Sequence, residues 1–163
     1  MREDGGFEEA FSTLYPFAYR AAHRIVGSVA EAEDIAADAL ARALVRWPRV
    51  GRMDHPEAWV VRVATNLAID STRKRRVTSA LQDPVVDPAE AAALRITVAV
   101  ALGQLPRRQR EVIALRYLAG LSEHEVAEAM GIADSSVKEH GKRAIASLRR
   151  RFGPDFQEES LAY

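Results

Sequence analysis

The sequence predicts an all-α protein of two small helical domains, the first at 7–77 and the second at 94–152. Apolar residues recur at steps of three and four through most of the 163 residues, the spacing of one helical face. No stretch shows the sustained alternation with β-branched residues that is typical of strands. The segment 78–93 has two Asp-Pro pairs and no basic residue, which predicts a linker. The acidic segment 153–163 is expected to form a frayed tail.

The composition suits a packed protein and excludes several kinds of chemistry. Hydrophobic residues make up 48% of the chain and charged residues 28%, a balance that supports a core. Cysteine is absent, which excludes disulfides, iron–sulfur clusters, thiolate zinc sites and a cysteine nucleophile. No apolar run approaches the roughly 18 residues of a membrane helix, and the N-terminal residues lack the apolar core of a signal peptide. We expect a soluble, cytoplasmic protein.

Prolines mark the ends of most of the expected helices. Pro16 is expected to interrupt the first helix, because proline lacks the N–H that an inner turn needs. Pro48 stops the second helix, and Pro106 separates the fourth from the fifth. Pro56 begins the third, since proline suits the first helical position. The five expected helices cover 7–27, 30–47, a stretch from Pro56 through the first domain, 94–105 and 107–118.

A helix-turn-helix pattern follows Gly120. Ser122 and Glu125 have the spacing of a capping box, which begins a short helix. Gly131 then suits a left-handed turn position. Asp134 can cap a second helix that runs to about Arg151. A short helix, a glycine turn and a second helix are typical of DNA-binding helix-turn-helix motifs.

The second helix of this motif has a narrow apolar seam and a wide basic face. Its seam contains Val137, Gly141, Ala144, Ile145 and Leu148, and we expect close packing at Gly141 because glycine otherwise weakens a helix. Its polar side contains Ser135, Ser136, Lys138, Glu139, Lys142 and Arg143. Small hydroxyl residues followed by cations suit a major groove. By charge alone a solvated amphipathic helix would also fit, but 94–152 has eleven basic and six acidic residues, which favours a polyanionic partner.

The helix from Pro56 carries a different polar stripe. Trp59, Arg62, Asn66, Asp70 and Arg73 lie within about 80° on one side. The stripe ends in a basic cluster, Arg73, Lys74, Arg75 and Arg76. Aromatic rings stack on unpaired bases, amides read base edges and cations hold phosphates, so this face favours single-stranded nucleic acid. The alternative is that Trp59 belongs to the core or its rim and that Arg62 and Asp70 form a surface ion pair.

The helix 30–47 combines acidic and apolar residues. Its members are Glu33, Asp34, Ile35, Asp38, Leu40 and Leu44. An acidic face gains nothing from facing DNA, and a basic protein surface is the better partner. A solvated charged face is the alternative interpretation.

Enzyme and metal chemistry have almost no support. The four histidines are scattered, and Glu128 stands where a zinc-protease helix would need a second histidine after His124. The sequence has neither a glycine-rich phosphate loop nor a Gly-x-Ser-x-Gly elbow. We expect no catalytic residues, no metal and no cofactor.

The chain resembles a sigma factor of the extracytoplasmic-function (ECF) type in the sigma-70 family. The resembling motifs span both domains and about 130 residues. They include Ala32-Glu33-Asp34-Ile35, Pro56-Glu57-Ala58-Trp59, Arg62-Val63-Ala64-Thr65-Asn66-Leu67-Ala68-Ile69-Asp70, Leu105-Pro106-Arg107-Arg108-Gln109-Arg110-Glu111-Val112 and Ser136-Val137-Lys138. The order of these motifs and the intervening linker make the resemblance specific.

The resemblance implies a dissociable initiation subunit of bacterial RNA polymerase that recognises promoter DNA. It assigns region 2 to 7–77 and region 4 to 94–152. Core binding, through the β′ clamp helices, is implied for Glu33, Asp34, Ile35, Asp38, Leu40 and Leu44, with the β flap as a second contact. Recognition and opening of the −10 element are implied for Trp59, Arg62, Asn66, Asp70, Arg73, Lys74, Arg75 and Arg76. Recognition of the −35 element is implied for Arg116, Ser135, Ser136, Lys138, Glu139, Lys142 and Arg143. An anti-sigma partner is common in the family, although no motif here shows one.

Some positions depart from the family pattern. The family usually has serine at Ala133, so Asp134 is expected to take over the cap. Glu139 cannot pair with phosphate, but it could accept a hydrogen bond from cytosine. The recognised −35 sequence therefore does not follow by analogy.

Two other readings remain open at this point. Val137-Lys138-Glu139-His140 also resembles the recognition helix of LuxR-type regulators, which would make the protein a free-standing duplex-binding dimer. Such regulators need a receiver or ligand domain, usually α/β, whereas this N-terminal half is predicted to be helical. A helical interaction module without DNA function is a third reading, which the basic patches disfavour.

Overall fold

The computed structural model describes residues 6–80, 98–156 and 158–161, and these are almost entirely helical. No strand occurs in the described part of the chain, in agreement with the predicted all-α class. The elements are α1 (Phe7–Val26), α2 (Val29–Val45), α3 (Trp47–Val50), α4 (Pro56–Ala80), a helix at 98–104, α6 (Arg107–Ile113), the π-helix η1 (Ala114–Leu118), α7 (Glu123–Met130), α8 (Asp134–Phe152) and the 3₁₀ helix η2 (Glu158–Leu161). None of the described helices is long and apolar enough to cross a membrane.

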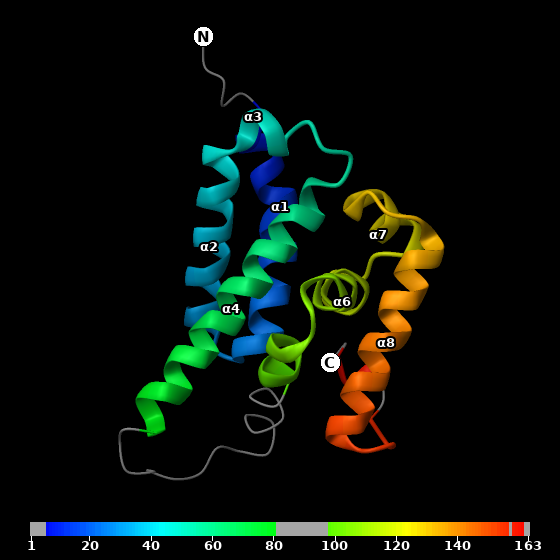
Figure 1. Ribbon diagram of the computed structural model, residues 1–163. Helices are drawn as coiled ribbons and strands as arrows, with labels where there is room; N and C mark the ends of the chain where they lie inside the picture. Colours follow the sequence, from blue (N-terminus) through cyan, green and yellow to red (C-terminus); the bar gives the residue numbers. More distant parts are fainter. Residues whose placement is uncertain (1–5, 81–97, 157, 162–163) are drawn as a thin grey trace.

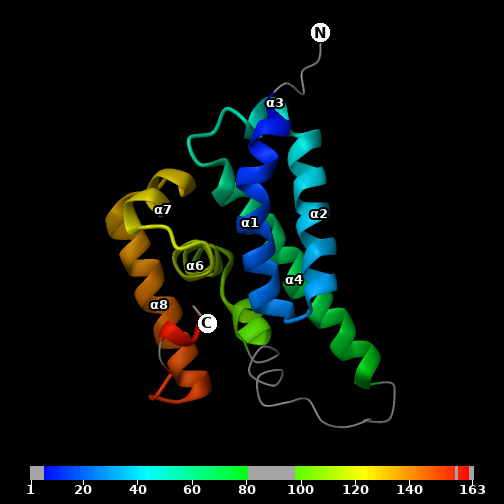
Figure 2. The same cartoon turned by 180° about the vertical axis from the view of Figure 1, so that it is seen from behind.

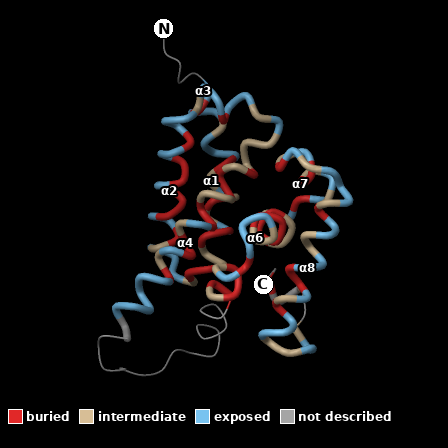
Figure 3. The backbone as a smooth tube through the Cα atoms, in the orientation of Figure 1, coloured by how far each residue is buried: buried red, intermediate tan, exposed pale blue. Residues whose placement is uncertain are grey.

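Helices α1, α2 and α4 form the N-terminal bundle (Figure 1). Their apolar faces meet in a core that includes Leu14, Ile25, Leu40, Val60 and Val61, all at most 2% exposed. The outer side of α2 and the last turns of α4 are exposed (Figure 3). Helix α4 begins at Pro56, as predicted, and continues through 78–80. The rest of the predicted linker, 81–93, lies outside the described residues.

The predicted interruption at Pro16 is wrong. Helix α1 runs unbroken from Phe7 to Val26 with Pro16 inside it. Pro16 lies on the exposed side of the helix, where the carbonyl that loses its N–H partner can be solvated instead. The hydrophobic residues on the opposite side hold the helix against α2 and α4.

The second predicted helix is two helices. Helix α2 ends at Val45, and Trp47 begins the separate short helix α3. The Trp47 ring packs edge-on against Phe7, with ring centroids 5.2 Å apart. A Cβ at Gly51 would lie 2.7 Å from the Trp47 ring, so only glycine fits beneath it.

The second half contains the predicted helix-turn-helix. Ser122 and Glu125 form both hydrogen bonds of a capping box at the start of α7. Gly131 ends α7 in the left-handed conformation, at φ 63°. The predicted cap at Asp134 is wrong, because Ala133 occupies the N-cap without a side-chain hydrogen bond. Asp134 lies in the first turn instead, where its charge suits the helix dipole and its carboxylate lies 3.4 Å from His124 Nδ1.

The prediction of a frayed tail is wrong for its described part. Leu161 is 2% exposed, and the rings of Phe152 and Phe156 lie 5.7 Å apart. The Tyr117 hydroxyl donates to Glu158 at 2.6 Å. Apolar residues spaced along this acidic segment could have indicated its packing. They pack against η1 and α8.

The two halves pack against each other. Helix α6 lies between α4 and α8 in both views (Figures 1 and 2), and η1 contacts both α1 and α4. The Arg24 guanidinium donates to the Tyr117 carbonyl at 2.5 Å. A seam therefore runs between α4 on one side and the helix at 98–104, α6 and α7 on the other.

Candidate nucleic-acid and protein interfaces

The polar face of α8 is open to solvent. Ser135, Lys138, Glu139, Lys142 and Arg143 are exposed, and Ser136 is half-buried. The other side packs inward through Val137, Ala144, Ile145 and Leu148. The predicted division of this helix into an apolar seam and an open polar face is therefore confirmed.

Two ion pairs on α8 are solvent-exposed. Arg143 Nε donates to Glu139 Oε1 at 2.8 Å, one turn away, and Lys138 Nζ lies 3.8 Å from Glu123. Exposed pairs of this kind are weak, so a phosphate or a base edge can replace the carboxylate. Glu139 thus orients Arg143 in the protein alone, a role that the sequence did not indicate.

Arg116 differs from the other residues expected to contact the −35 element. It is half-buried, and its Nη1 donates to the Leu121 carbonyl at 2.8 Å. This hydrogen bond holds the chain just before the capping box of α7. Arg116 therefore stabilises the turn that precedes the helix-turn-helix. It also lines a groove together with residues of α8.

The expected close packing at Gly141 is wrong. A Cβ at this position would meet only Val112, at 3.8 Å, which is ordinary van der Waals contact. The helix therefore has room for alanine, and the packing in this structure gives no reason for the glycine.

The stripe on α4 is divided between exposed and half-buried residues. Asn66, Asp70, Arg73, Lys74, Arg75 and Arg76 are exposed, whereas Trp59 and Arg62 are half-buried. The alternative ion pair between Arg62 and Asp70 is not formed. Arg62 pairs with Glu111 of α6, and Asp70 pairs with Arg73 at 3.3 Å.

The stripe faces the second half of the chain across the seam. A groove of about 500 Å³ separates the two sides and is lined by Trp59, Arg62, Val63, Asn66, Asp70, Arg107, Arg110 and Glu111. Glu111 is buried, and its Oε1 accepts from Arg62 Nη2 at 2.9 Å and from Arg107 Nε at 3.0 Å. Nothing in the sequence indicated that Glu111 and Arg110 would contact α4, because a sequence pattern does not show which helices pack together.

His55 bridges the seam at its other end. Its two ring nitrogens lie 2.9 Å from Glu57 Oε1 and 3.1 Å from Glu128 Oε2 of α7. Hydrogen bonds to the carboxylates of Glu128 first, and then of Glu57, raise the pKa of His55 above 6.5. At the capping box, hydrogen bonds from Ser122 lower the pKa of Glu125. Within the described residues, no group of three or more histidine and acidic side chains is arranged to hold a metal ion.

The acidic face of α2 is exposed, but two apolar residues that were expected to contact a partner there are buried. Glu33, Asp34 and Asp38 are exposed, and Leu44 is 41% exposed. Ile35 and Leu40 are buried at 8% and 1%. Their expected place on the contact surface is wrong, because the same helical periodicity that groups them turns them into the bundle core.

Both halves of the chain match known families. Residues 10–78 match the family described as sigma-70 region 2, and residues 95–148 match the family described as sigma-70, region 4. The chain belongs to the ECF group of the sigma-70 family. The N-terminal bundle thus corresponds to region 2, and the helix-turn-helix lies in region 4. The match of residues 10–78 to region 2 favours this family over the LuxR-type alternative.

Relatives of this ECF sigma factor match most of its length. The ECF RNA polymerase sigma factor SigL of Mycobacterium tuberculosis is 33% identical, with 80% of both chains covered. The RNA polymerase sigma-E factor of Streptomyces coelicolor is 32% identical over 88% of this chain and 84% of its own.

A solved structure supports the fold. The sigma factor RpoE of Bartonella quintana, in complex with the anti-sigma factor NepR, has a TM-score of 0.54 and 23% identity. The match covers 92% of this chain and 98% of that one.

Proposed function

We propose that this alternative sigma factor binds core RNA polymerase in the cytoplasm and directs it to promoters through two separate DNA-reading faces. Residues 7–77 would act on the −10 element and 94–152 on the −35 element. The observation that carries the proposal is the pair of contrasting helix faces, each within the region that matches its family. Helix α4 offers an aromatic ring, an amide and cations, and α8 offers an exposed face of serines and cations.

The −10 role is assigned to the stripe on α4. Trp59 would stack on an unpaired base, and Asn66 lies about two helical turns further along, where it would hydrogen-bond a base edge. The exposed cluster of Arg73, Lys74 and Arg76 would hold the backbone phosphates. The last turns of α4 project beyond the bundle (Figure 1), which leaves room for a strand to pass.

The core-binding role is assigned to the exposed acidic residues of α2. Glu33, Asp34 and Asp38 would face a basic surface on the β′ clamp helices, with Leu44 as an apolar contact. Region 4 would contact the β flap. An anti-sigma protein is a further proposed partner. The chain is not proposed to catalyse a reaction itself; the polymerase would supply the chemistry.

Run-off transcription tests the proposal directly. Purified core enzyme is combined with this protein on genomic fragments, and transcripts are mapped to their start points. We expect a small set of start points that share −10 and −35 elements and that need this protein. Absence of any dependent transcript with active core enzyme would contradict the proposal.

Core binding is tested by reversing charge on α2. Glu33→Lys together with Asp34→Lys should reduce co-purification with core polymerase by roughly tenfold, because like charges would then face each other. Glu8→Lys with Glu9→Lys is the matched control, since these residues are exposed on α1. Equal recovery of both double variants would remove the acidic face from the interface.

A further inference from the structure

Glu139 is an acidic residue on the otherwise basic polar face of α8. It lies in the second turn of the helix, within the half of a recognition helix that contacts base edges in the major groove. A carboxylate repels the backbone phosphates, so Glu139 adds nothing to general affinity for DNA. Among the described residues it accepts a hydrogen bond only from Arg143, one turn further along. A carboxylate in this position suits a hydrogen-bond donor on a base.

The hydrogen bond between Glu139 and Arg143 engages one side of the guanidinium. Arg143 Nε donates to Glu139 Oε1 at 2.8 Å, and the two side chains are 64% and 54% exposed. Within the described residues, Nη1 and Nη2 of Arg143 make no hydrogen bond. An arginine can use these two terminal nitrogens to bind O6 and N7 of guanine together. Glu139 therefore orients Arg143 and leaves its guanine-binding edge free.

The second carboxylate oxygen of Glu139 is also available to DNA. Oε1 accepts from Arg143, whereas Oε2 accepts no hydrogen bond from a described residue. An ionised carboxylate only accepts hydrogen bonds, so it suits an amino group on a base edge. Cytosine presents its N4 amino group alone in the major groove, whereas adenine adds the N7 acceptor and thymine presents the O4 acceptor. Cytosine is therefore the base that fits Oε2 best.

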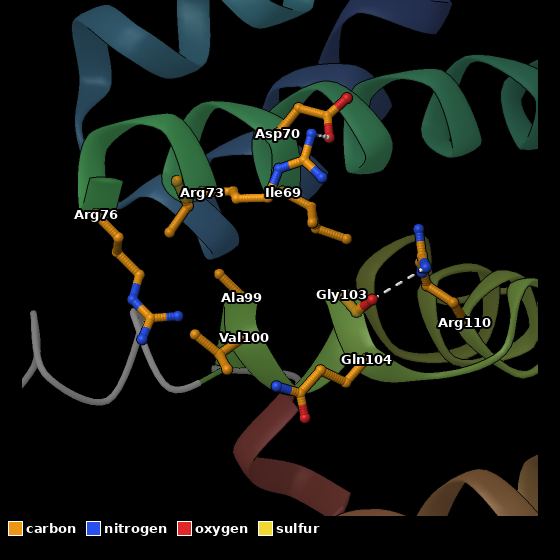
Figure 4. Close-up of a pocket in the computed structure, with 10 residues that line it drawn as sticks. Ile69, Asp70, Arg73, Arg76, Ala99, Val100, Gly103, Gln104 and Arg110 are labelled. Atoms are coloured by element: carbon orange, nitrogen blue, oxygen red, sulfur yellow. Dashed lines mark hydrogen bonds and ion pairs between the residues drawn. The ribbon is translucent and has the colours of Figure 1, made fainter. Parts of the chain in front are cut away.

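The arginine–carboxylate pair on the stripe of α4 is joined differently. Arg73 Nη2 lies 3.3 Å from Asp70 Oδ1 (Figure 4). This contact occupies one of the two terminal nitrogens, so Arg73 would have to break it before binding a guanine through both. A phosphate can be bound by a single free nitrogen, which suits the role proposed for α4. The contact through Nε is therefore the feature that makes the pair on α8 suitable for base recognition.

We propose that Glu139 and Arg143 act as one unit that recognises two adjacent base pairs of the −35 element, with Arg143 on a guanine and Glu139 on the amino group of a cytosine. The proposal rests on the assignment of α8 to the −35 element and names the bases that this site prefers. Residues four positions apart share one face of a helix, and long side chains lean toward its N-terminus, so both tips reach one base step. Glu139 also acts against thymine, because its carboxylate repels the O4 acceptor.

Base preference is measured with holoenzyme assembled from core polymerase and the full chain. A promoter found by run-off transcription is varied at each base pair of its −35 element, and relative binding is obtained by sequencing bound and unbound DNA. We expect one guanine and an adjacent cytosine at which other bases lower binding about tenfold. Glu139→Gln should abolish the preference for cytosine. Glu123→Gln removes another carboxylate that pairs with a cation of α8, and this matched control should keep both preferences.

Two further measurements separate base recognition from a structural role. Glu139→Gln removes a negative charge near the phosphates, so it should bind promoters that lack the cytosine at least as tightly as the unchanged protein does. A residue that only supported the fold would, when replaced, weaken binding to every sequence alike. Arg143→Lys keeps the charge but loses the planar fork, so its preference for guanine should fall about tenfold. Replacing that guanine by 7-deazaguanine, which lacks N7, should weaken binding by the unchanged protein and leave Arg143→Lys almost unaffected.

The possible failures of this proposal and of the −35 assignment are distinguishable. If the unchanged holoenzyme prefers no cytosine beside the guanine, or if Glu139→Gln keeps that preference, the proposal is wrong. The −35 assignment then stands as long as Arg143→Ala loses protection of that element. If transcription depends on the protein but binding is the same for every base pair of the −35 element, the assignment of α8 and the proposal fail together.

Discussion

Helices α4 and α8 both carry a polar stripe suited to nucleic acid, yet the fold treats them differently. On α8 the cations pair with exposed carboxylates, such as Arg143 with Glu139, which are 64% and 54% exposed. On α4, Arg62 pairs with Glu111, which is 7% exposed. An exposed pair yields readily to a competing anion, whereas a buried pair yields only when the elements around it separate. The exposure of the paired carboxylate therefore distinguishes Arg62 from Arg143.

The largest effect on function is expected from substitution of Trp59 on α4. Trp59→Ala should reduce promoter opening about ten- to hundredfold, because stacking on a base contributes roughly 1–3 kcal/mol. The measurement is permanganate reactivity of unpaired thymines on a promoter found by run-off transcription. Phe11→Ala, an aromatic truncation 43% exposed on α1, is the control. Unchanged reactivity in a folded Trp59→Ala protein that still binds core polymerase would remove the aromatic ring from strand capture.

The open face of α8 should respond next. Arg143→Ala is expected to weaken binding to −35 duplex by about tenfold or more, since a side chain at a base or phosphate contributes roughly 1–3 kcal/mol. Footprinting on the same promoter measures this loss. Arg151→Ala, in the last turn of the same helix, controls for general charge and should have a smaller effect. Retained protection of the −35 element in Arg143→Ala would place the recognition contact elsewhere.

A smaller effect is expected from pH, through His55 at the seam between the two halves. Protonated His55 pairs with Glu128 across the seam, with Glu57 beside it, and these carboxylates raise its pKa above 6.5. The contribution of this pair to the free energy of unfolding is therefore fully present below about pH 6.5 and is lost as pH rises through the raised pKa. The free energy of unfolding of the full chain, measured with denaturant, should fall between about pH 6 and pH 8.5. His55→Gln should abolish most of this dependence, and His124→Gln should preserve it; the reverse result would assign it to His124.

The smallest expected effect lies within α8. Gly141→Ala should raise the free energy of unfolding of region 4 by about 0.5–1 kcal/mol, because glycine costs that much in a helix and the added Cβ meets no close contact. Thermal unfolding of the full chain measures this change. Gly51→Ala is the opposite control, since its Cβ would lie 2.7 Å from Trp47 and should destabilise the protein. Loss of stability in Gly141→Ala would show that α8 needs the glycine for another reason.

The pattern of this chain determined most of its helices and the polar faces of α4 and α8. A capping box, a glycine turn and apolar spacing act over a few residues, so Ser122, Gly131 and the seam of α8 could be interpreted locally. Local patterns gave wrong predictions where solvent exposure or a neighbouring helix decided the local structure. Pro16 was accommodated because its turn faces water, and Leu161 docks because a surface lies near it.

Only the tertiary structure decided which charged groups meet. Arg62 and Glu111 are 49 positions apart, and His55 and Glu128 are 73 apart. Helical periodicity says which face a residue occupies, but it carries no information on the helix that packs against that face. The sequence by itself therefore determined two polar helix faces, while the packing of region 4 on α4 decided that Trp59 and Arg62 of one face are half-buried.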